Sequence, residues 1–401
     1  MEFDRILARE LRRLRESFPV IVVHGARQVG KTWLLEHCFP GFAYVSLDSG
    51  VQAEAAATRP GEFLDRLGTP AIIDEIQYAP SLLREIKVRV DRDRGAMGRW
   101  FLTGSRSLAL MASVSESLAG RAAVLPLHGL SGDEWLAAAG RDGGPRADWG
   151  EFFFRGSWPG LWAEPAPPRE RWYQGYLATY IERDVRNALR IGSLRDFERF
   201  LRAAGARTAQ TLNLSELGRD VGIAPSTARE WMSVLVASNL VFLLEPYHRS
   251  LGKRIAKSPK LYFPDTGLAA WLAGFGSRDA LERSPQAGAF FENYVVGQWL
   301  RRRDWLEPST SLWYWRDQSG AEVDLVVERD GLLHPIECKR KERPDRDDCR
   351  GIRRFTDFYG KEAVGPATVA CLAGERFEID EGVLAVDGRF WMGESSSGNL
   401  Q

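Results

Sequence analysis

The chain has 401 residues, enough for two or three domains that each bury a core. Its 54 basic and 54 acidic residues cancel, which excludes a protein that attracts nucleic acid through its overall charge. Four scattered cysteines without a CxxC pair exclude a disulfide framework and indicate reduced thiols in a cytoplasmic protein. The N-terminus is charged and no apolar run reaches about 18 residues, so we expect neither a signal peptide nor a membrane span.

The first part of the chain alternates helical and extended patterns. Apolar residues at helical spacing predict an amphipathic helix at the N-terminus: Ile6, Leu7, Leu11 and Leu14. Three short apolar runs follow, PVIVVHG, PAIIDE and RWFLTGS, with helical stretches between them. Strands that alternate with helices predict a parallel sheet covered on both faces.

The composition changes twice more along the chain. The Pro/Gly-rich stretches RDGGPRADWG and WAEPAPPRE indicate loops, an arginine-rich helical unit follows, and the last part contains one long helix and then alternating strands. We therefore predict units at residues 1–150, 151–275 and 276–392. The polar residues 393–401 are expected to form a disordered tail.

A phosphate-binding motif lies between the first strand and the helix after it. GARQVGKT matches GxxxxGK[ST], whose glycines let backbone N–H groups wrap around phosphates. We expect Lys31 to reach the β- and γ-phosphates and the Thr32 hydroxyl to ligate magnesium. The predicted nucleotide contacts are Gly25, Ala26, Arg27, Gln28, Val29, Gly30, Lys31, Thr32 and Trp33.

The run AIIDEIQ provides the acidic partner of this motif. Three apolar residues place Asp74 at the end of a strand, where it can hold the magnesium shell. Glu75 beside it is expected to orient or deprotonate the attacking water. The alternative, a chance glycine-rich turn, does not account for the strand context and the acidic pair together.

Further catalytic groups are predicted after the third strand. WFLTGS ends in Thr103, Gly104 and Ser105, and a hydroxyl here could sense the γ-phosphate or align the water, although a plain strand-to-helix cap would look the same. Arg121 in ESLAGRAAV is a candidate arginine finger, with Arg106 as its rival and a solvated arginine as the simpler alternative.

The middle unit contains a helix-turn-helix pattern. We expect Ser215 to cap a first helix, Gly222 to make the turn and Ser226 to cap a second helix. A wing strand should follow at residues 241–244. The second helix would present Thr227, Arg229 and Glu230 to a DNA groove, although such units also serve as protein-binding modules. The run HRSLGKRIAKSPK, which ends at Lys260, is either a basic patch for nucleic acid or a solvated loop.

The last part of the chain carries a set of acidic residues and a lysine in apolar segments. Asp324 lies in GAEVDLVV, and Glu337 and Lys339 lie two apart in HPIECKR, on one face of a strand. The spacing leaves room for one hairpin that would pair the two strands. With Glu292 in AFFENYVV, these carboxylates could converge on a divalent metal, Mg²⁺ or Mn²⁺; a solvated hairpin is the alternative.

The order of these motifs resembles a family of bacterial and archaeal AAA-type ATPases with a C-terminal winged helix and a domain similar to the PD-(D/E)xK nucleases. The matching phrases are GARQVGKT, AIIDEIQYAP, FLTGSRS, SLAGR, YIERDV, KLYFPDTGLAAWLAG, GAFFENYVV, GAEVDLVV and IECKR, and they run from about Val20 to Lys339. The usual helical lid and second sensor arginine of AAA proteins are not evident.

The resemblance implies an α/β fold with a P-loop NTPase parallel-sheet domain, a helical winged-helix middle unit and a C-terminal α/β restriction-endonuclease-like domain. It further implies ATP and Mg²⁺ at Lys31, Thr32, Asp74 and Glu75, Ser105 as the sensor and Arg121 as the finger. In the nuclease-like part it implies a site made of Glu292, Asp324, Glu337 and Lys339.

Two functions from different classes remain open on the sequence. One is an enzyme that couples ATP turnover to a metal-dependent nuclease acting on DNA. The other is a nucleotide-dependent switch in which the winged helix and an inactive nuclease fold only bind DNA or a protein partner. A finger that acts between chains would require a homo-oligomer.

Overall fold

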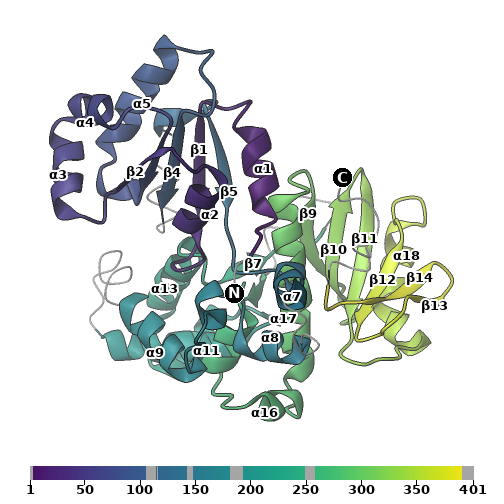
Figure 1. Ribbon diagram of the computed structural model, residues 1–401. Helices are drawn as coiled ribbons and strands as arrows, with labels where there is room; N and C mark the ends of the chain where they lie inside the picture. The colour runs from purple at the N-terminus through teal and green to yellow at the C-terminus, as the bar shows by residue number, and fades with distance from the viewer. Residues whose placement is uncertain are drawn as a thin grey trace.

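The computed structural model describes residues 3–104, 114, 116–141, 148–180, 193–248 and 258–390. Three bodies pack together: an N-terminal α/β body lies above a helical middle body and a C-terminal body built on a second sheet (Figure 1). Within these residues no helix is long and apolar enough to cross a membrane. All four cysteines are free thiols, as expected.

The N-terminal body is a five-stranded parallel sheet in the order β2-β3-β4-β1-β5. Its strands are β1 Val20–His24, β2 Ala43–Ser46, β3 Ala71–Asp74, β4 Trp100–Gly104 and β5 Ala122–Pro126. Its helices are α1 Leu7–Leu14, α2 Lys31–Cys38, α3 Gly50–Thr58, α4 Pro60–Leu67 and α5 Ser81–Arg92, with a 3₁₀ turn at Ile76–Tyr78. The predictions of a first amphipathic helix and of three buried strands are therefore confirmed.

Alternating residues of each strand enter two separate cores. Ile21 and Val23 pack with Leu7, Leu11 and Leu34 from α1 and α2 on one face. Val20 and Val22 pack on the other face with the apolar sides of α4 and α5. Because both faces are covered, the strands consist of continuous apolar residues, as the sequence pattern indicated.

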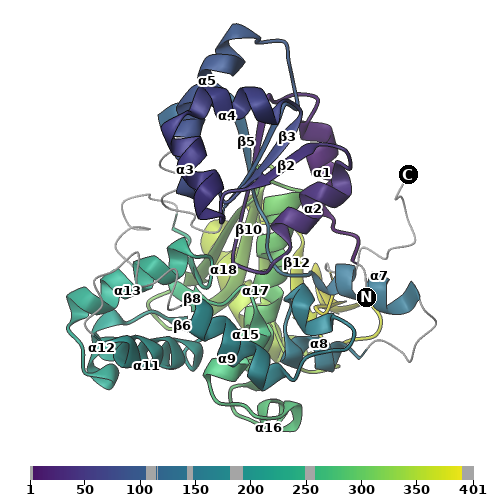
Figure 2. The ribbon, with the colours of Figure 1, turned by 60° about the vertical axis from the view of Figure 1, so that its left-hand side comes forward.

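The middle body is mostly helical (Figure 2). Its helices are α7 Gly132–Arg141, α8 Trp149–Arg155, α9 Arg169–Tyr180, α11 Leu194–Gly205, α12 Leu214–Val221, α13 Pro225–Ala237, α15 Thr266–Leu272 and α16 Arg278–Glu282, with a 3₁₀ turn at Pro159–Trp162. A small antiparallel sheet joins β6 Gln210–Thr211, β8 Lys260–Tyr262 and β7 Phe242–Leu244, in that order.

The helix caps in this body differ from the prediction. Asn213, not Ser215, caps α12, because its side chain accepts the hydrogen bond from the N–H of Glu216. α13 begins at Pro225 after Ala224 and has no side-chain cap, so Ser226 lies inside the helix. The predicted turn at Gly222 is confirmed by its φ of 86°.

The C-terminal body is a mixed six-stranded sheet in the order β13-β14-β12-β11-β10-β9. Its strands are β9 Ser311–Arg316, β10 Glu322–Arg329, β11 Leu332–Cys338, β12 Ala367–Cys371, β13 Phe377–Asp380 and β14 Val383–Asp387. Its helices are α17 Ala287–Trp305 and α18 Arg350–Tyr359, with a 3₁₀ turn at Arg346–Cys349. β10 and β11 pair as an antiparallel hairpin, which confirms the predicted pairing.

The helices after the first sheet belong structurally with the rest of the chain. α7 lies against α17, where Gly132 donates its N–H to Gln298 at 3.2 Å. In α8, Gly150 lies against the guanidinium of Arg278, whose side chain also pairs with Asp148. α7 also contacts the N-terminal body, where Glu134 pairs with Arg5 at 3.2 Å, and the boundary at residue 150 stays a prediction.

Candidate functional site

The phosphate-binding loop leaves the carboxyl end of β1 and leads into α2. Gly25 is required by a close approach, because a Cβ there would lie 2.1 Å from the carbonyl oxygen of Leu127. Gly30, at φ 92°, starts α2 in a left-handed conformation that suits glycine. The loop N–H groups and the N-terminus of α2 therefore form the positive cradle that the motif predicts.

Lys31 lies across this loop and is 7% exposed. Its Nζ donates to the carbonyl oxygens of Gly25 at 3.1 Å and Ala26 at 2.9 Å. These neutral acceptors hold the ammonium beside the cradle, where a phosphate oxygen can take their place.

Asp74 gathers hydroxyl groups from three neighbouring elements. The Thr32 hydroxyl donates to its Oδ1 at 2.8 Å, the Thr103 hydroxyl donates to the same oxygen, and Ser46 donates to Oδ2 at 3.3 Å. A carboxylate beside a threonine hydroxyl at the loop is the oxygen set that suits Mg²⁺. Thr32 and Asp74, which the sequence paired only by motif, therefore meet in the structure.

Glu75 has an unusual backbone conformation for a residue with a side chain. Its φ is 57°, and its N–H donates to the Thr103 hydroxyl at 3.3 Å. Its Oε2 accepts a hydrogen bond from the Gln77 amide. Backbone strain of this kind concentrates at functional sites. Gln77 is a site residue that the sequence analysis did not select, whereas Thr103 is one of the hydroxyls that it named at the end of WFLTGS.

Of the predicted sensor Ser105 and the candidate fingers Arg106 and Arg121, the structure locates only Arg121. Ser105 and Arg106 lie outside the described residues. Arg121 pairs with Asp91, with Nε–Oδ1 at 2.8 Å and Nη2–Oδ2 at 3.0 Å. It precedes β5, at the edge of the sheet opposite the loop, a distance of roughly 16 Å for a five-residue strand. Arg121 therefore cannot reach a nucleotide bound in its own chain.

The outer side of the loop is held by residues from elsewhere in the chain. The Trp158 indole donates to the carbonyl of Arg27 at 2.9 Å, and Arg5 Nη1 donates to the carbonyl of Val29 at 2.8 Å. Gln28, between them, has a φ of 60°. Trp33 is 41% exposed and stacks on His37 with 4.7 Å between ring centroids.

The end of β5 is bound by α17, so the nucleotide edge of the sheet faces the rest of the molecule. Trp305 Nε1 donates to the carbonyl of Pro126 at 2.9 Å, and Arg301 Nε donates to that of Gly129 at 3.1 Å. His128 and Asp304 lie 2.6 Å apart in a buried hydrogen bond. Burial lowers the pKa of His128, so this ring is neutral at physiological pH.

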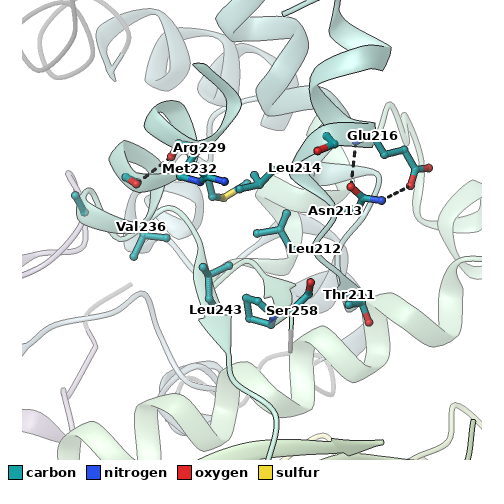
Figure 3. Close-up of a pocket in the computed structure, with 14 residues that line it drawn as sticks. Thr211, Leu212, Asn213, Leu214, Glu216, Arg229, Met232, Val236, Leu243 and Ser258 are labelled. Carbon is teal, nitrogen blue, oxygen red and sulfur yellow. Dashed lines mark hydrogen bonds between the residues drawn. The ribbon is translucent and has the colours of Figure 1, made fainter. Parts of the chain in front are cut away.

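α13, the second helix of the predicted helix-turn-helix, borders an open groove of about 1110 Å³. Figure 3 shows Arg229, Met232 and Val236 of α13 on one side, with Leu212 and Leu214 facing them. Arg229 and Glu230 are exposed and Thr227 is half-buried, so two of the three predicted groove-reading side chains point outward. Arg249, Lys253, Arg254 and Lys257 of the predicted basic patch lie outside the described residues.

The C-terminal acidic residues come together as predicted. Asp324 interrupts the apolar strand β10 where its pairing with β9 shifts, and its Oδ2 accepts the N–H of Cys338 at 2.9 Å. Lys339 Nζ contacts Glu337 Oε1 at 2.5 Å, which confirms that these residues share one face. Glu337 Oε2 is buried without a hydrogen-bond partner.

Lys260 lies inside this acidic set and not on the surface, against both alternatives for the basic run. Its Nζ contacts Glu292 Oε1 at 2.8 Å, Asp324 Oδ1 at 3.6 Å and, more closely, Glu322. The lysine side chain is only 4% exposed. We call Lys260, Glu292, Glu322, Asp324, Glu337 and Lys339 the carboxylate cluster.

Charge and burial shift the pKa values in the cluster. Burial, followed by the nearby Asp324, raises the pKa of Glu292 to about 8 and that of Glu337 to about 8. Burial alone would lower the pKa of Lys260, but the surrounding carboxylates raise it above its usual range. In the described part of the chain, no group of three or more His, Cys, Asp and Glu side chains is arranged to hold a metal ion. Of the predicted metal set, Glu292 and Asp324 contact Lys260, whereas Glu337 contacts Lys339.

Comparison with known proteins identifies relatives of this chain. It is 33% identical over 344 residues to two proteins, Rv2008c of Mycobacterium tuberculosis and Mb2031c of Mycobacterium bovis, each called an uncharacterized protein. The alignment covers 85% of this chain and 74% of each relative. The chain belongs to their family.

Three family models match successive parts of this family member. An AAA domain matches residues 17–136, a domain of unknown function (DUF8612) residues 146–279, and another (DUF4143) residues 287–389. The N-terminal body is therefore an AAA-type P-loop domain, and the AAA match includes Lys31, Thr32, Asp74 and Glu75. The carboxylate cluster spans the two domains of unknown function. Lys260 lies in the DUF8612 match, and the other members lie in the DUF4143 match.

Solved structures with a similar fold include the Walker-type ATPase PABY2304 of Pyrococcus abyssi, at 18% identity and a TM-score of 0.45, covering 68% of this chain and 96% of that one. AMPPCP-bound DnaA from Aquifex aeolicus matches at 14% identity and a TM-score of 0.31, covering 58% of this chain and 86% of that one. Both TM-scores are below 0.5, so neither structure is a guide to the function of this chain.

Proposed function

We propose that this protein hydrolyses ATP at the phosphate-binding loop and uses nucleotide turnover to control how its middle and C-terminal bodies engage nucleic acid. The observation that carries the first part is the hydrogen bond between Thr32 and Asp74, with Lys31 beside it in the loop. This brings the magnesium-holding oxygens and the phosphate-binding ammonium together before any ligand arrives.

The chemistry follows from the positions of these side chains. Bound magnesium would neutralise charge on the phosphates, with Thr32 and Asp74 holding it. Lys31 exchanges its carbonyl acceptors for phosphate oxygens and stabilises the charge that develops there. Glu75, next to Asp74 at the end of β3, orients the attacking water and accepts its proton.

Coupling to the other bodies is supported by what surrounds the loop. Trp158 of the middle body and Arg5 bind the loop carbonyls, and Arg301, Asp304 and Trp305 of α17 bind the segment after β5. A shift of the loop on nucleotide binding would therefore act directly on the Trp158 contact, and on the α17 contacts through Leu127, which lies against Gly25.

Nucleic acid is proposed as the partner on the order of elements. In the middle body the order α11-β6-α12-α13-β7-β8, with β8 between β6 and β7, supports a winged helix. In the C-terminal body the order α17-β9-β10-β11-α18-β12 supports the nuclease-like fold. The exposed Arg229 on α13 is the side chain best placed for a phosphate or a base.

For the C-terminal body, the geometry favours binding over cutting. Metal-dependent cutting is the second candidate, and the buried, unpartnered Oε2 of Glu337 is the observation on its side. Against it, the position between Glu292 and Asp324 that a divalent cation would need is filled by Lys260. We therefore assign no step of cleavage to Glu337 and Lys339.

The test is the rate of ATP hydrolysis with and without single- and double-stranded DNA, followed by DNA integrity in the same samples with Mg²⁺ or Mn²⁺. We expect hydrolysis that DNA stimulates and that leaves the DNA intact. Cutting that disappears in Lys339→Ala would establish the nuclease instead. A rate that DNA does not change, together with no salt-dependent DNA affinity, would replace nucleic acid by a protein partner.

A further inference from the structure

The carboxylate cluster receives one member from another body of the molecule. Lys260 begins β8, the central strand of the small sheet in the middle body, whereas Glu292 lies on α17 and Glu322 and Asp324 on β10. β8 and α17 lie side by side in Figure 2. The lysine side chain crosses from one body into the acidic interior of the other.

Within the cluster, protein groups already contact the carboxylates of Glu292 and Asp324, whereas Glu337 Oε2 is buried without a hydrogen-bond partner. Glu292 Oε1 accepts from Lys260 Nζ at 2.8 Å and from the Tyr262 hydroxyl at 2.5 Å. Asp324 Oδ2 accepts from the N–H of Cys338 at 2.9 Å, while its Oδ1 faces Lys260. Tyr262 belongs to β8, as Lys260 does, so the same short strand supplies two of these donors.

The aromatic ring of Tyr314 completes the pocket of the ammonium. Lys260 Nζ lies 5.6 Å from the centroid of that ring, within the range of a cation–π contact. Arg316 approaches the far side of Glu322, at 3.7 Å from its Oε2. The Lys260 ammonium is therefore buried between carboxylates and the face of an aromatic ring. Together these surroundings stabilise a charged ammonium in a protein interior.

A divalent ion held between Glu292 and Asp324 would have to take the place of the Lys260 ammonium. Mg²⁺ binds oxygens at about 2.1 Å in an octahedron, which requires Glu292 and Asp324 to turn toward one point. That point is the one Lys260 Nζ takes in the structure, and two cations cannot share it. At Glu292 and Asp324 the lysine therefore supplies the positive charge that a metal would otherwise supply.

We propose that the Lys260 ammonium is the resident cation of the carboxylate cluster, so that the cluster joins the middle and C-terminal bodies without a divalent metal. The carboxylates act as an anchor for β8. This inference does not depend on nucleic acid or on ATP, because it concerns only side chains in the folded chain.

The experiment measures Mn²⁺ binding to the full chain by electron paramagnetic resonance, without nucleotide and in an Asp74→Asn background that weakens the site at the phosphate-binding loop. The parent protein, which carries Asp74→Asn and an unchanged carboxylate cluster, is expected to bind no Mn²⁺ at the cluster. Lys260→Met should gain one Mn²⁺ per chain, lose it again when Glu292→Gln is added, and melt about 5 °C or more below the parent. Added Mn²⁺ should restore most of that loss.

Lys339→Met is the matched control, because it removes the other lysine of the cluster and should gain no Mn²⁺. If Lys260→Met does not fold, Lys260→Met combined with Glu292→Gln removes one charge of each sign and should fold. One Mn²⁺ bound by the parent and lost on Glu292→Gln alone would overturn the proposal. So would a Lys260→Met protein that melts with the parent and binds no Mn²⁺, or a double variant that melts with the parent. Loss of DNA binding or of ATP hydrolysis would leave these readouts unchanged, so the two proposals fail separately.

Discussion

Two buried lysines mark the two sites of this molecule, and their surroundings differ. Lys31 contacts the neutral carbonyl oxygens of Gly25 and Ala26, whereas Lys260 contacts the carboxylates of Glu292, Glu322 and Asp324. An ammonium leaves neutral acceptors for a phosphate at little cost, but it does not leave desolvated carboxylates. The same side chain is thus suited to bind a ligand in one place and to replace one in the other.

Exchanging each lysine for methionine is the change with the largest effect on this comparison. Lys31→Met should lower the rate of ATP hydrolysis by roughly 1000-fold, because charge on the phosphates loses its main side-chain partner. Its melting temperature should change less than that of Lys260→Met, since the acceptors of Lys31 at Gly25 and Ala26 are neutral carbonyl oxygens. Phosphate release and differential scanning fluorimetry measure the two effects. Equal loss of stability in both variants would remove the distinction.

Glu75→Gln sharpens the comparison, because it separates chemistry from binding at the first site. The amide keeps the shape of the side chain but cannot accept a proton, so kcat should fall by roughly 100-fold. The Kd for ATP, measured with a fluorescent analogue, should stay within about threefold because Lys31 and Thr32 are intact. Glu54→Gln, on the exposed surface of α3, is the control. A weakened Kd with an unchanged kcat would assign Glu75 to binding.

Trp158→Phe tests the link between the loop and the middle body and has the smallest expected effect. It removes one hydrogen bond to the carbonyl of Arg27, a loss of about 1 kcal/mol in the free energy of unfolding, and should raise the KM for ATP severalfold. Trp162→Phe is the matched control. The Trp162 indole donates to the carbonyl of Gly156 at 2.8 Å, and this bond does not involve the phosphate-binding loop. If both variants change KM equally, the effect is general loosening of the body and not coupling.

The parts of these sites that the sequence predicts are those encoded by short runs of neighbouring residues. Lys31, Thr32 and Asp74 follow from two motifs on strands that any parallel sheet brings to one edge. The hairpin that joins Asp324 to Glu337 follows from alternation and length. Both kinds of inference need only local geometry.

Lys260 and Trp158 could not be predicted in this way, because their partners are far away in the sequence. Lys260 lies 32 residues from Glu292, and Trp158 lies 131 residues from Arg27. One local signal was present: Lys260 is followed by Leu261, Tyr262 and Phe263, all fully buried. A charge at the start of such an apolar run is costly unless paired, which argues against a surface loop.

The contacts that hold the phosphate-binding loop also set the order in which this protein can mature during synthesis. The five strands of the first sheet have all been translated by Pro126, yet Trp158 is needed to bind the carbonyl of Arg27. Asp304 and Trp305, which bind the segment after β5, emerge from the ribosome much later. Domains fold vectorially as they emerge. A nascent chain of this protein therefore carries a complete sheet well before it carries the contacts that hold the phosphate-binding loop and the end of β5.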